Sequence, residues 1–436
     1  MAAQKEDLHD GPHQIEHTYD DVFGKITEEG PNFRNVHPYL TDCVGFIGTV
    51  ILMMKTQIGL GVLAIPSALD VLGMVPGILC LLAVACITTW SEYVIGTFKL
   101  QHREVYSIDD AGGIMFGLPG RVVLSAAFCL YWIFVSGSAI LGLSIGLNAV
   151  STHATCTAVF AVVAAIVGFA FSSIRTLGRI TWLAWVSLPC ILVAVIIVTI
   201  AVGVADRPAD APQTDGPWVS DWRVAGNPTF AEAIAADSNL LFAFSGTPGF
   251  FSIVSEMRNP EKYTAAILAC QAGVTTLRLL PSSGLSRRRH QIISYAFALP
   301  GLLGTMAIVT HIPSKFIFVH ILRGSHHLNS NTPTHWVTWL SCTFGVTIVA
   351  WIIASTIPVF DALVSLIGAL LGPVMCIQPM GAMWLYDNWR RGKEQPRKRS
   401  FLMVAGTYGS IKGIMDSYSE SGGSSAFSCK DNSNSV

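Results

Sequence analysis

The sequence predicts an all-α polytopic membrane protein with about 10–11 spans. Hydrophobic residues make up 51% of the 436 residues and charged residues only 13%. Soluble domains carry roughly 25% charged residues, so this chain has about half the usual share. Its apolar residues form long runs, and a helix needs about 20 of them to cross a bilayer. Two of these runs contain glycine, proline and polar residues near their middle, which predicts helices that are broken inside the membrane.

The two ends of the chain differ from its middle. Residues 1–42 are polar and mostly acidic, and we expect them to form a disordered cytoplasmic tail. The membrane domain is predicted over 43–416 and a polar C-terminal tail over 417–436. A net charge of −1, with no basic stripe, zinc-ligand spacing or Gly-rich phosphate loop, indicates no nucleic-acid partner, no metal site and no cofactor.

The charges between the apolar runs predict how they are threaded. If the N-terminus is cytoplasmic, the loops after the second, fourth and sixth runs are cytoplasmic too, and these are the loops that contain Lys and Arg. The link after the third run, "NAVSTHAT", contains neither and is expected outside. The predicted spans are about 43–69, 74–97, 122–150, 156–173, 180–204, 230–255, 264–280, 292–312, 336–357, 359–386 and a short last one at 401–415.

The seventh run, 264–280, departs from this pattern. It is followed by "LRLLPSSGLSRRRHQ", whose proline, small polar residues and three consecutive arginines are not typical of a membrane helix. If the run crosses the membrane, Arg287–Arg289 lie on the outer side, against the rule that the other loops follow. If it does not cross, the orientation of every later span changes.

Two stretches are predicted to be unwound within the membrane. The first is "TQIGLG", Thr56–Gly61, and the second is "FAFSGTPGFF", Phe242–Phe251, at a similar depth in the sixth run. Non-helical backbone persists at membrane depth only where protein or a water-filled cavity satisfies its polar groups. We therefore expect both breaks to face a cavity. The alternative is that Gly59 and Gly61 only allow close helix packing, as small residues often do in membranes.

Broken helices five spans apart predict an inverted repeat of five plus five spans, about 43–204 and 230–386, with a substrate site at mid-membrane. N–H groups at the start of each second half-helix suit a carboxylate, and the freed carbonyls suit an ammonium group. The expected substrate is therefore a zwitterionic amino acid. The predicted binding residues are Thr56, Gln57, Ile58, Gly59, Gly61, Ser245, Gly246, Thr247 and Gly249, with Tyr131 and Phe242 lining an apolar pocket or serving only in helix packing.

Lys55 and Glu92 are candidates for proton coupling, because a charge within a span costs about 2.5–3.5 kcal/mol and usually faces a cavity or a partner. Lys55 directly precedes the first break. It is predicted either to bind a carboxylate or the freed carbonyls, or to extend to the cytoplasmic face. Glu92 is predicted either to carry the coupled proton or to pair with Lys99 or Arg103 at the interface. The first break contains no Asp or Glu, which favours a proton over a metal cation.

Four stretches resemble the amino acid/auxin permease family, and within it the fungal neutral amino acid permeases. They are "KTQIGLGVLAIPSAL", "FSIVSEMRNPEKY", "THIPSKFIFVHILRGSHHL" and "QPMGAMWLYDNW". The resemblance implies an eleven-span protein of the five-plus-five inverted-repeat type, with its C-terminus outside. It also implies uptake of neutral amino acids by secondary active transport coupled to protons, in the plasma membrane rather than the vacuolar membrane.

The resemblance lapses at "AGVTTLRLLPSSGLSRRRHQ" and "SFLMVAGTYGSIKGIM", where the family has a full seventh span and a longer last span. An inactive product of an incomplete gene model is therefore one alternative function. A non-transporting amino acid sensor is another. An enzyme is not expected, because the chain contains no H-E-x-x-H motif and no paired intramembrane aspartates.

Overall fold

The computed structural model describes residues 18–20, 24–26, 45–59, 61–102, 105, 107–174, 177–204, 223–255, 257–279, 288–322, 325, 327 and 332–388. Within them the fold is helical, apart from two short antiparallel strands, β1 (Thr18–Asp20) and β2 (Gly24–Ile26), which pair with Thr18 opposite Ile26. The predicted last span at 401–415, the C-terminal tail and Arg103 lie outside the described residues.

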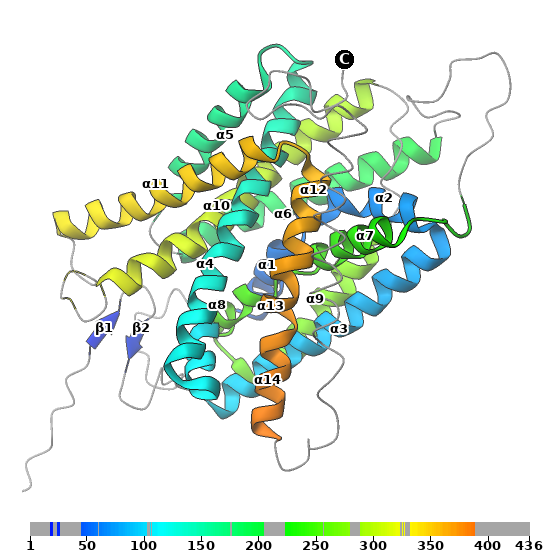
Figure 1. The fold of residues 1–436 in the computed structure, drawn as a ribbon. Helices are drawn as coiled ribbons and strands as arrows, with labels where there is room; N and C mark the ends of the chain where they lie inside the picture. The colour runs from blue at the N-terminus through cyan, green and yellow to red at the C-terminus, as the bar shows by residue number, and fades with distance from the viewer. Residues whose placement is uncertain are drawn as a thin grey trace, which may run out of the picture.

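The first six predicted spans each coincide with one or more helices (Figure 1). The first and sixth are interrupted, as predicted. The third begins earlier than expected, because its helix joins a preceding segment at a bend where Gly117 has a φ of 70° and Pro119 follows. The elements are α1 (Phe46–Gln57), α2 (Gly61–Leu72), α3 (Met74–Gln101), α4 (Ile108–Ser151), α5 (Thr157–Ser172), α6 (Leu177–Val204), α7 (Phe230–Ala243), η1 (Thr247–Gly249) and α8 (Phe250–Ser255).

The later elements also follow the predicted order. The expected span 292–312 is longer in the structure, because its helix runs through Pro300 and Pro313 to Leu322. Prolines are tolerated in membrane helices where neighbouring groups satisfy the freed backbone. The elements are η2 (Pro260–Lys262), α9 (Tyr263–Arg278), α10 (Arg288–Leu322), α11 (Pro333–Thr356), α12 (Phe360–Leu366), the π-helix η4 (Ile367–Leu371), α13 (Gly372–Cys376) and α14 (Gln378–Asp387).

The chain is an integral, polytopic membrane protein. Among the described residues, six helical segments are long and apolar enough to cross a membrane, and α1 and α5 are shorter apolar helices. The six are Met74–Gln101, Ile108–Ser151, Trp182–Ala201, Ile292–Leu322, Pro333–Thr356 and Phe360–Asp387, the last made of α12, η4, α13 and α14 in one bent column (Figure 1). Cys156, at the link between α4 and α5, is disulfide-bonded.

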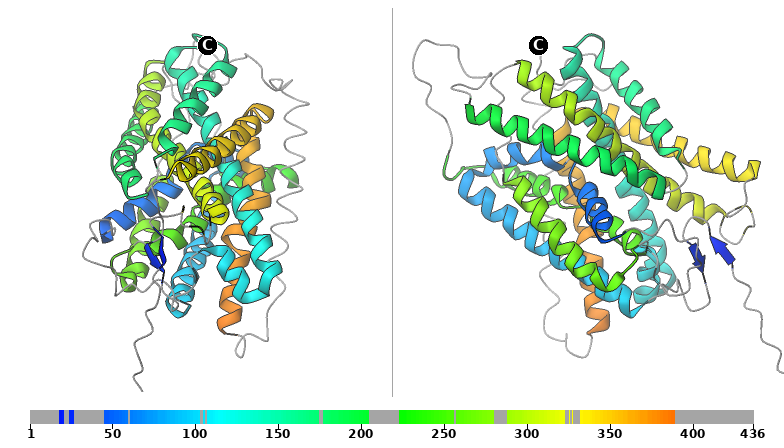
Figure 2. Two further views of the ribbon diagram at one scale, coloured as in Figure 1. Left: turned by 90° about the vertical axis from the view of Figure 1, so that its left-hand side faces the viewer. Right: turned by 180° about the vertical axis from the view of Figure 1, so that it is seen from behind.

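Helices distant in sequence pack around the two breaks. In the views of Figure 2, α6 lies along α10, and α1 lies beside α9. α2 packs against α7 so closely that a Cβ on Gly61 would lie 2.6 Å from Ala243 Cα. Gly368 packs against the Ser238 carbonyl of α7 in the same way. Small residues thus bring the broken helices into backbone contact.

Candidate functional site

The two breaks have different backbone conformations. After Gln57 the chain straightens, because Ile58 is extended with φ −90° and ψ 114°. After Ala243 it stays compact, since Phe244 (φ −95°, ψ 6°) and Gly246 (φ −77°, ψ −11°) lead directly into η1. Both breaks therefore expose backbone polar groups at the ends of their half-helices.

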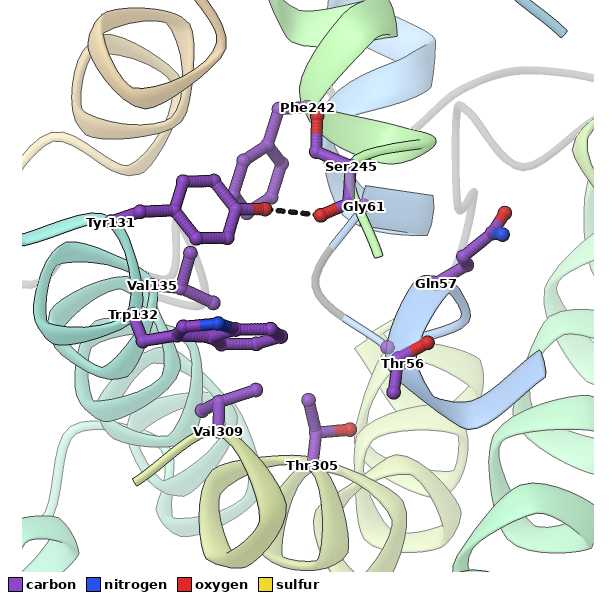
Figure 3. Close-up of a pocket in the computed structure, with 11 residues that line it drawn as sticks. Thr56, Gln57, Gly61, Tyr131, Trp132, Val135, Phe242, Ser245, Thr305 and Val309 are labelled. Carbon is purple, nitrogen blue, oxygen red and sulfur yellow. Dashed lines mark hydrogen bonds between the residues drawn. The ribbon is translucent and has the colours of Figure 1, made fainter. Parts of the chain in front are cut away.

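A small cavity lies between the breaks, enclosed by side chains of α1, α4, α7 and α10 (Figure 3). Tyr131 and Trp132 reach into it from α4, while Thr305 and Val309 face it from α10. The cavity is lined by Thr56, Gln57, Gly59, Gly61, Tyr131, Trp132, Val135, Phe242, Ser245, Thr305 and Val309. Its wall is therefore mainly aromatic and aliphatic, with hydroxyl and amide groups beside the two breaks.

The cavity is closed in this structure. The space in which the centre of a water molecule can move is ≈ 20 Å³, and one water needs about 10–15 Å³ on this measure. The Tyr131 hydroxyl donates a hydrogen bond to the Ser245 carbonyl across the cavity (Figure 3). A molecule the size of an amino acid thus fits only if the walls move apart.

Most, but not all, of the predicted binding residues line this cavity. Four of them lie in or beside the breaks without facing it, namely Ile58, Gly246, Thr247 and Gly249. Four lining residues were missed: Trp132, Val135, Thr305 and Val309. Trp132 is adjacent to the predicted Tyr131, so an aromatic pair within an apolar run was the available signal. Thr305 and Val309 carry no local signal, because a threonine or valine in a span packs equally well on any face.

Glu92 is fully buried between the broken helices. Its carboxylate accepts hydrogen bonds from Gln57 Nε2 at 2.8 Å and from Gln271 Nε2 at 2.7 Å, and a longer one from Thr247 Oγ1 at 3.5 Å. These residues come from the end of α1, from α9 and from η1. Glu92 therefore links both breaks. Gln57 connects this carboxylate to the cavity, because Gln57 lines the cavity while its amide points away from it (Figure 3) and donates to Glu92.

Of the two partners in the interfacial alternative for Glu92, Lys99 does not bind it, and Arg103 lies outside the described residues. Lys99 Nζ donates to the Val105 carbonyl and forms no ion pair with Glu92. Gln271 was not predicted, although an amide in an apolar run was a visible signal. The Tyr263 hydroxyl adds a 3.3 Å hydrogen bond to the Glu92 carbonyl, which ties α9 to α3 at this level.

Lys55 does not extend to the cytoplasmic face. Its side chain is buried, and Nζ donates a 2.9 Å hydrogen bond to the Gly301 carbonyl of α10. The predicted partners were a carboxylate or the carbonyls freed at the break, whereas the observed carbonyl belongs to α10. Thr305, one turn further along α10, donates its hydroxyl to the same Gly301 carbonyl at 3.1 Å. The ammonium group thus holds α1 to α10 beside the cavity.

The chain is similar to a known protein family and to several fungal proteins. Residues 44–281 and 278–407 match the model of a family described as "Transmembrane amino acid transporter protein". A "Transmembrane transporter" of Gibberella moniliformis is 31% identical over 447 residues, covering 95% of this chain and 94% of the relative. A "Transmembrane transporter" of Fusarium pseudograminearum is 30% identical, covering 88% and 86%. An "N amino acid transport system protein" of Neurospora crassa is 29% identical, covering 93% and 92%.

Proposed function

The chain belongs to the family of transmembrane amino acid transporters, and from this premise we propose that it carries neutral amino acids across the membrane in symport with protons. One observation carries the proposal. The buried carboxylate of Glu92 is bonded to Gln57 at one helix break and to Thr247 at the other. Binding or loss of a proton at Glu92 therefore changes hydrogen bonds at both helix breaks at once.

The lining of the cavity supports a neutral substrate. Its described lining residues include no charged side chain, and they include three aromatic rings, those of Tyr131, Trp132 and Phe242. A charged substrate side chain would be buried there without a partner, which is costly. Aliphatic and aromatic side chains instead bury apolar surface against these rings, at roughly 25 cal/mol per Å². The name of the Neurospora relative, "N amino acid transport system protein", supports an amino acid as the cargo.

The backbone at the breaks is proposed to bind the two charged groups of the zwitterion. The N–H group that starts α2 at Gly61, which lines the cavity, lies at the positive end of its helix and suits the carboxylate. Ser245 and Thr56 supply hydroxyl groups to the same cavity. In the inverted-repeat interpretation, the two repeats of about 43–204 and 230–386 contribute one break each.

The partners of Glu92 suit a carboxyl group that gains and loses a proton. Both amides donate their N–H groups to it in this structure, and their oxygens, Gln57 Oε1 and Gln271 Oε1, have no hydrogen-bond partner among the described residues. An amide that rotates about its last bond can instead accept a hydrogen bond from a protonated carboxyl. The same two side chains therefore serve the charged and the neutral form.

The test is uptake of labelled amino acids into liposomes that contain the full chain. We expect uptake of neutral amino acids to rise when the outside is acidified and to be indifferent to sodium. Glu92→Gln should abolish the stimulation by the pH gradient while retaining exchange of internal for external amino acid. Asp70→Asn, which changes an exposed carboxylate on α2, is the matched control. Uptake that requires sodium and ignores pH would disprove proton symport.

We place the protein in the plasma membrane, because uptake from outside requires a carrier at the cell surface. A fluorescent fusion of the full chain, viewed in fungal cells, tests this directly. A signal at the cell boundary supports the proposal. A signal confined to the vacuolar membrane contradicts it and makes movement between vacuole and cytosol the function to measure.

A further inference from the structure

One arginine connects the two helix breaks. Arg278 is the last residue of α9 and is 2% exposed. Its Nη2 group donates hydrogen bonds to the carbonyl of Gln57, at 3.1 Å, and to the carbonyl of Ala243. Gln57 and Ala243 are the last residues of α1 and α7. The carboxyl ends of both first half-helices therefore meet on a single side chain.

This arrangement holds together the carboxyl ends of two helices, which carry partial charges of the same sign. The last carbonyls of a helix have no partner within the helix and carry the negative end of its dipole. Two such ends repel each other, and inside a membrane no bulk water satisfies them. The guanidinium of Arg278 supplies both the donors and the positive charge. It also stacks on the ring of Phe244, 3.8 Å from the ring centroid, and Phe244 lies within the second break.

The spacing that Arg278 maintains is the spacing of the closed cavity. Gln57, whose carbonyl Arg278 binds, lines the cavity, and so do Phe242 and Ser245 on either side of Ala243. With ≈ 20 Å³ of free space, the site admits an amino acid only when its walls move apart. A movement that separates the two breaks stretches the bridge through Arg278, so the side chain then gives up at least one carbonyl.

The surroundings of Arg278 allow such an exchange of partners. Its Nε and Nη1 groups are buried and have no hydrogen-bond partner among the described residues. Glu92 attracts it electrostatically but forms no ion pair with it in the described part of the chain. Gln271 Oε1, on the same helix as Arg278, is an unpaired acceptor. Unpaired donors and an unpaired acceptor thus lie on α9 itself.

We propose that Arg278 is a positioning residue that keeps the empty carrier closed by tying the carbonyls of Gln57 and Ala243 together, and that it releases one of them when substrate enters. The inference rests on the proposed function, in which this cavity receives an amino acid. It predicts a specific kinetic defect. An empty carrier must pass through its closed state to complete net uptake, whereas exchange of internal for external substrate takes place with the carrier loaded in both directions.

The experiment compares Arg278→Gln and Arg278→Lys with the unchanged chain in liposomes, measuring net uptake and exchange side by side. Arg278→Gln should lower net uptake by about tenfold or more, the change expected when charge-assisted hydrogen bonds are lost, and leave exchange within about threefold. Arg278→Lys keeps the charge and should recover part of the net uptake. Arg121→Gln, which removes an ion pair with Asp110 on α4, is the matched control and should change neither rate.

A second measurement does not depend on transport. In purified chain without substrate, amide hydrogen exchange at 57–61 and 243–249 should be faster in Arg278→Gln than in the unchanged chain, with α11 unaffected. If this holds but no chain transports amino acids, the bridge is supported and the proposed function fails. Equal losses of net uptake and exchange in a folded variant, or unchanged amide exchange at the breaks, would overturn the proposal.

Discussion

The first and second helix breaks are stabilised in different ways. The first opens the chain into an extended residue, Ile58, and relies on its neighbours, since Gly59 packs on Thr305 and Gly61 on Ala243. The second keeps the chain compact through its own backbone hydrogen bonds, from Phe244 N–H to the Leu241 carbonyl at 3.1 Å and from Gly249 N–H to the Gly246 carbonyl at 3.1 Å. The first break is therefore held by packing and the second by local bonding.

This difference indicates where each break is vulnerable. A break held by packing fails when a contact surface changes by one methyl group, because protein interiors tolerate little added volume. A break held by local bonds tolerates added volume better but depends on the partners of its remaining carbonyls. Substitutions at the two breaks should consequently differ both in size and in kind of effect.

The largest effect is expected for Gly61→Ala at the first break. The added Cβ would lie 2.6 Å from Ala243 Cα, a backbone atom of α7 that cannot move aside without moving its helix. Overpacking of this kind costs about 1–3 kcal/mol, occasionally more. We expect uptake to be lost and the thermal unfolding midpoint in detergent to fall.

The control for that variant is Gly345→Ala on α11. A Cβ there would have no neighbour within 4 Å, so the same chemical change should leave uptake and the unfolding midpoint unchanged. Normal uptake by Gly61→Ala would mean that α2 and α7 move apart freely. The view that packing holds the first break would then be wrong.

An intermediate effect is expected for Tyr131→Phe, which acts on the second break. The change removes the hydroxyl that donates to the Ser245 carbonyl and keeps the ring that lines the cavity. A buried carbonyl left without its donor costs about 1–3 kcal/mol. We expect uptake to fall by at least about fivefold, since about 1.4 kcal/mol corresponds to a factor of ten.

The matched control is Tyr93→Phe, which removes a hydroxyl from an exposed tyrosine on α3. It should leave uptake unchanged. If Tyr131→Phe also leaves uptake unchanged while Tyr131→Leu abolishes it, the ring alone matters. The second break would then hold its shape without help from α4.

The positions of the breaks could be predicted from sequence because the signal is local. Glycine, proline and polar residues inside an apolar run leave backbone groups that must be satisfied somewhere, and Thr56–Gly61 and Phe242–Phe251 both contain them. Glu92 and Lys55 were found for a similar reason, since an ionisable residue in a span needs a partner. In each case the residue type alone implies a free-energy cost in the membrane that a partner must offset.

The identity of the partners could not be predicted, because it depends on how helices rotate against each other. Nothing in the sequence relates Gln271 to Glu92, Gly301 to Lys55, or Thr305 to the cavity. Arg278 is the clearest example. In the sequence it belonged to a basic stretch that contradicted the loop pattern, whereas in the structure it is buried between the breaks. An arginine at the end of an apolar run needs a partner for the same reason as Lys55 does.

The smallest effect is expected for Gly249→Ala, and it decides between two views of the second break. Sequence reasoning placed Gly249 among the substrate-binding residues, whereas in the structure it lies just outside the cavity, and an added Cβ would meet only Trp132 at 3.4 Å and Thr56 at 3.8 Å. These are ordinary contacts, so we expect uptake within about twofold of the unchanged chain and an unchanged unfolding midpoint. Gly246→Ala should be more harmful, because its Cβ would lie 2.7 Å from Gln57 Cγ and from Thr56 Oγ1. If Gly249→Ala folds normally but loses uptake, the substrate approaches the backbone of η1 directly when the cavity opens. The second break would then bind substrate in addition to interrupting the helix.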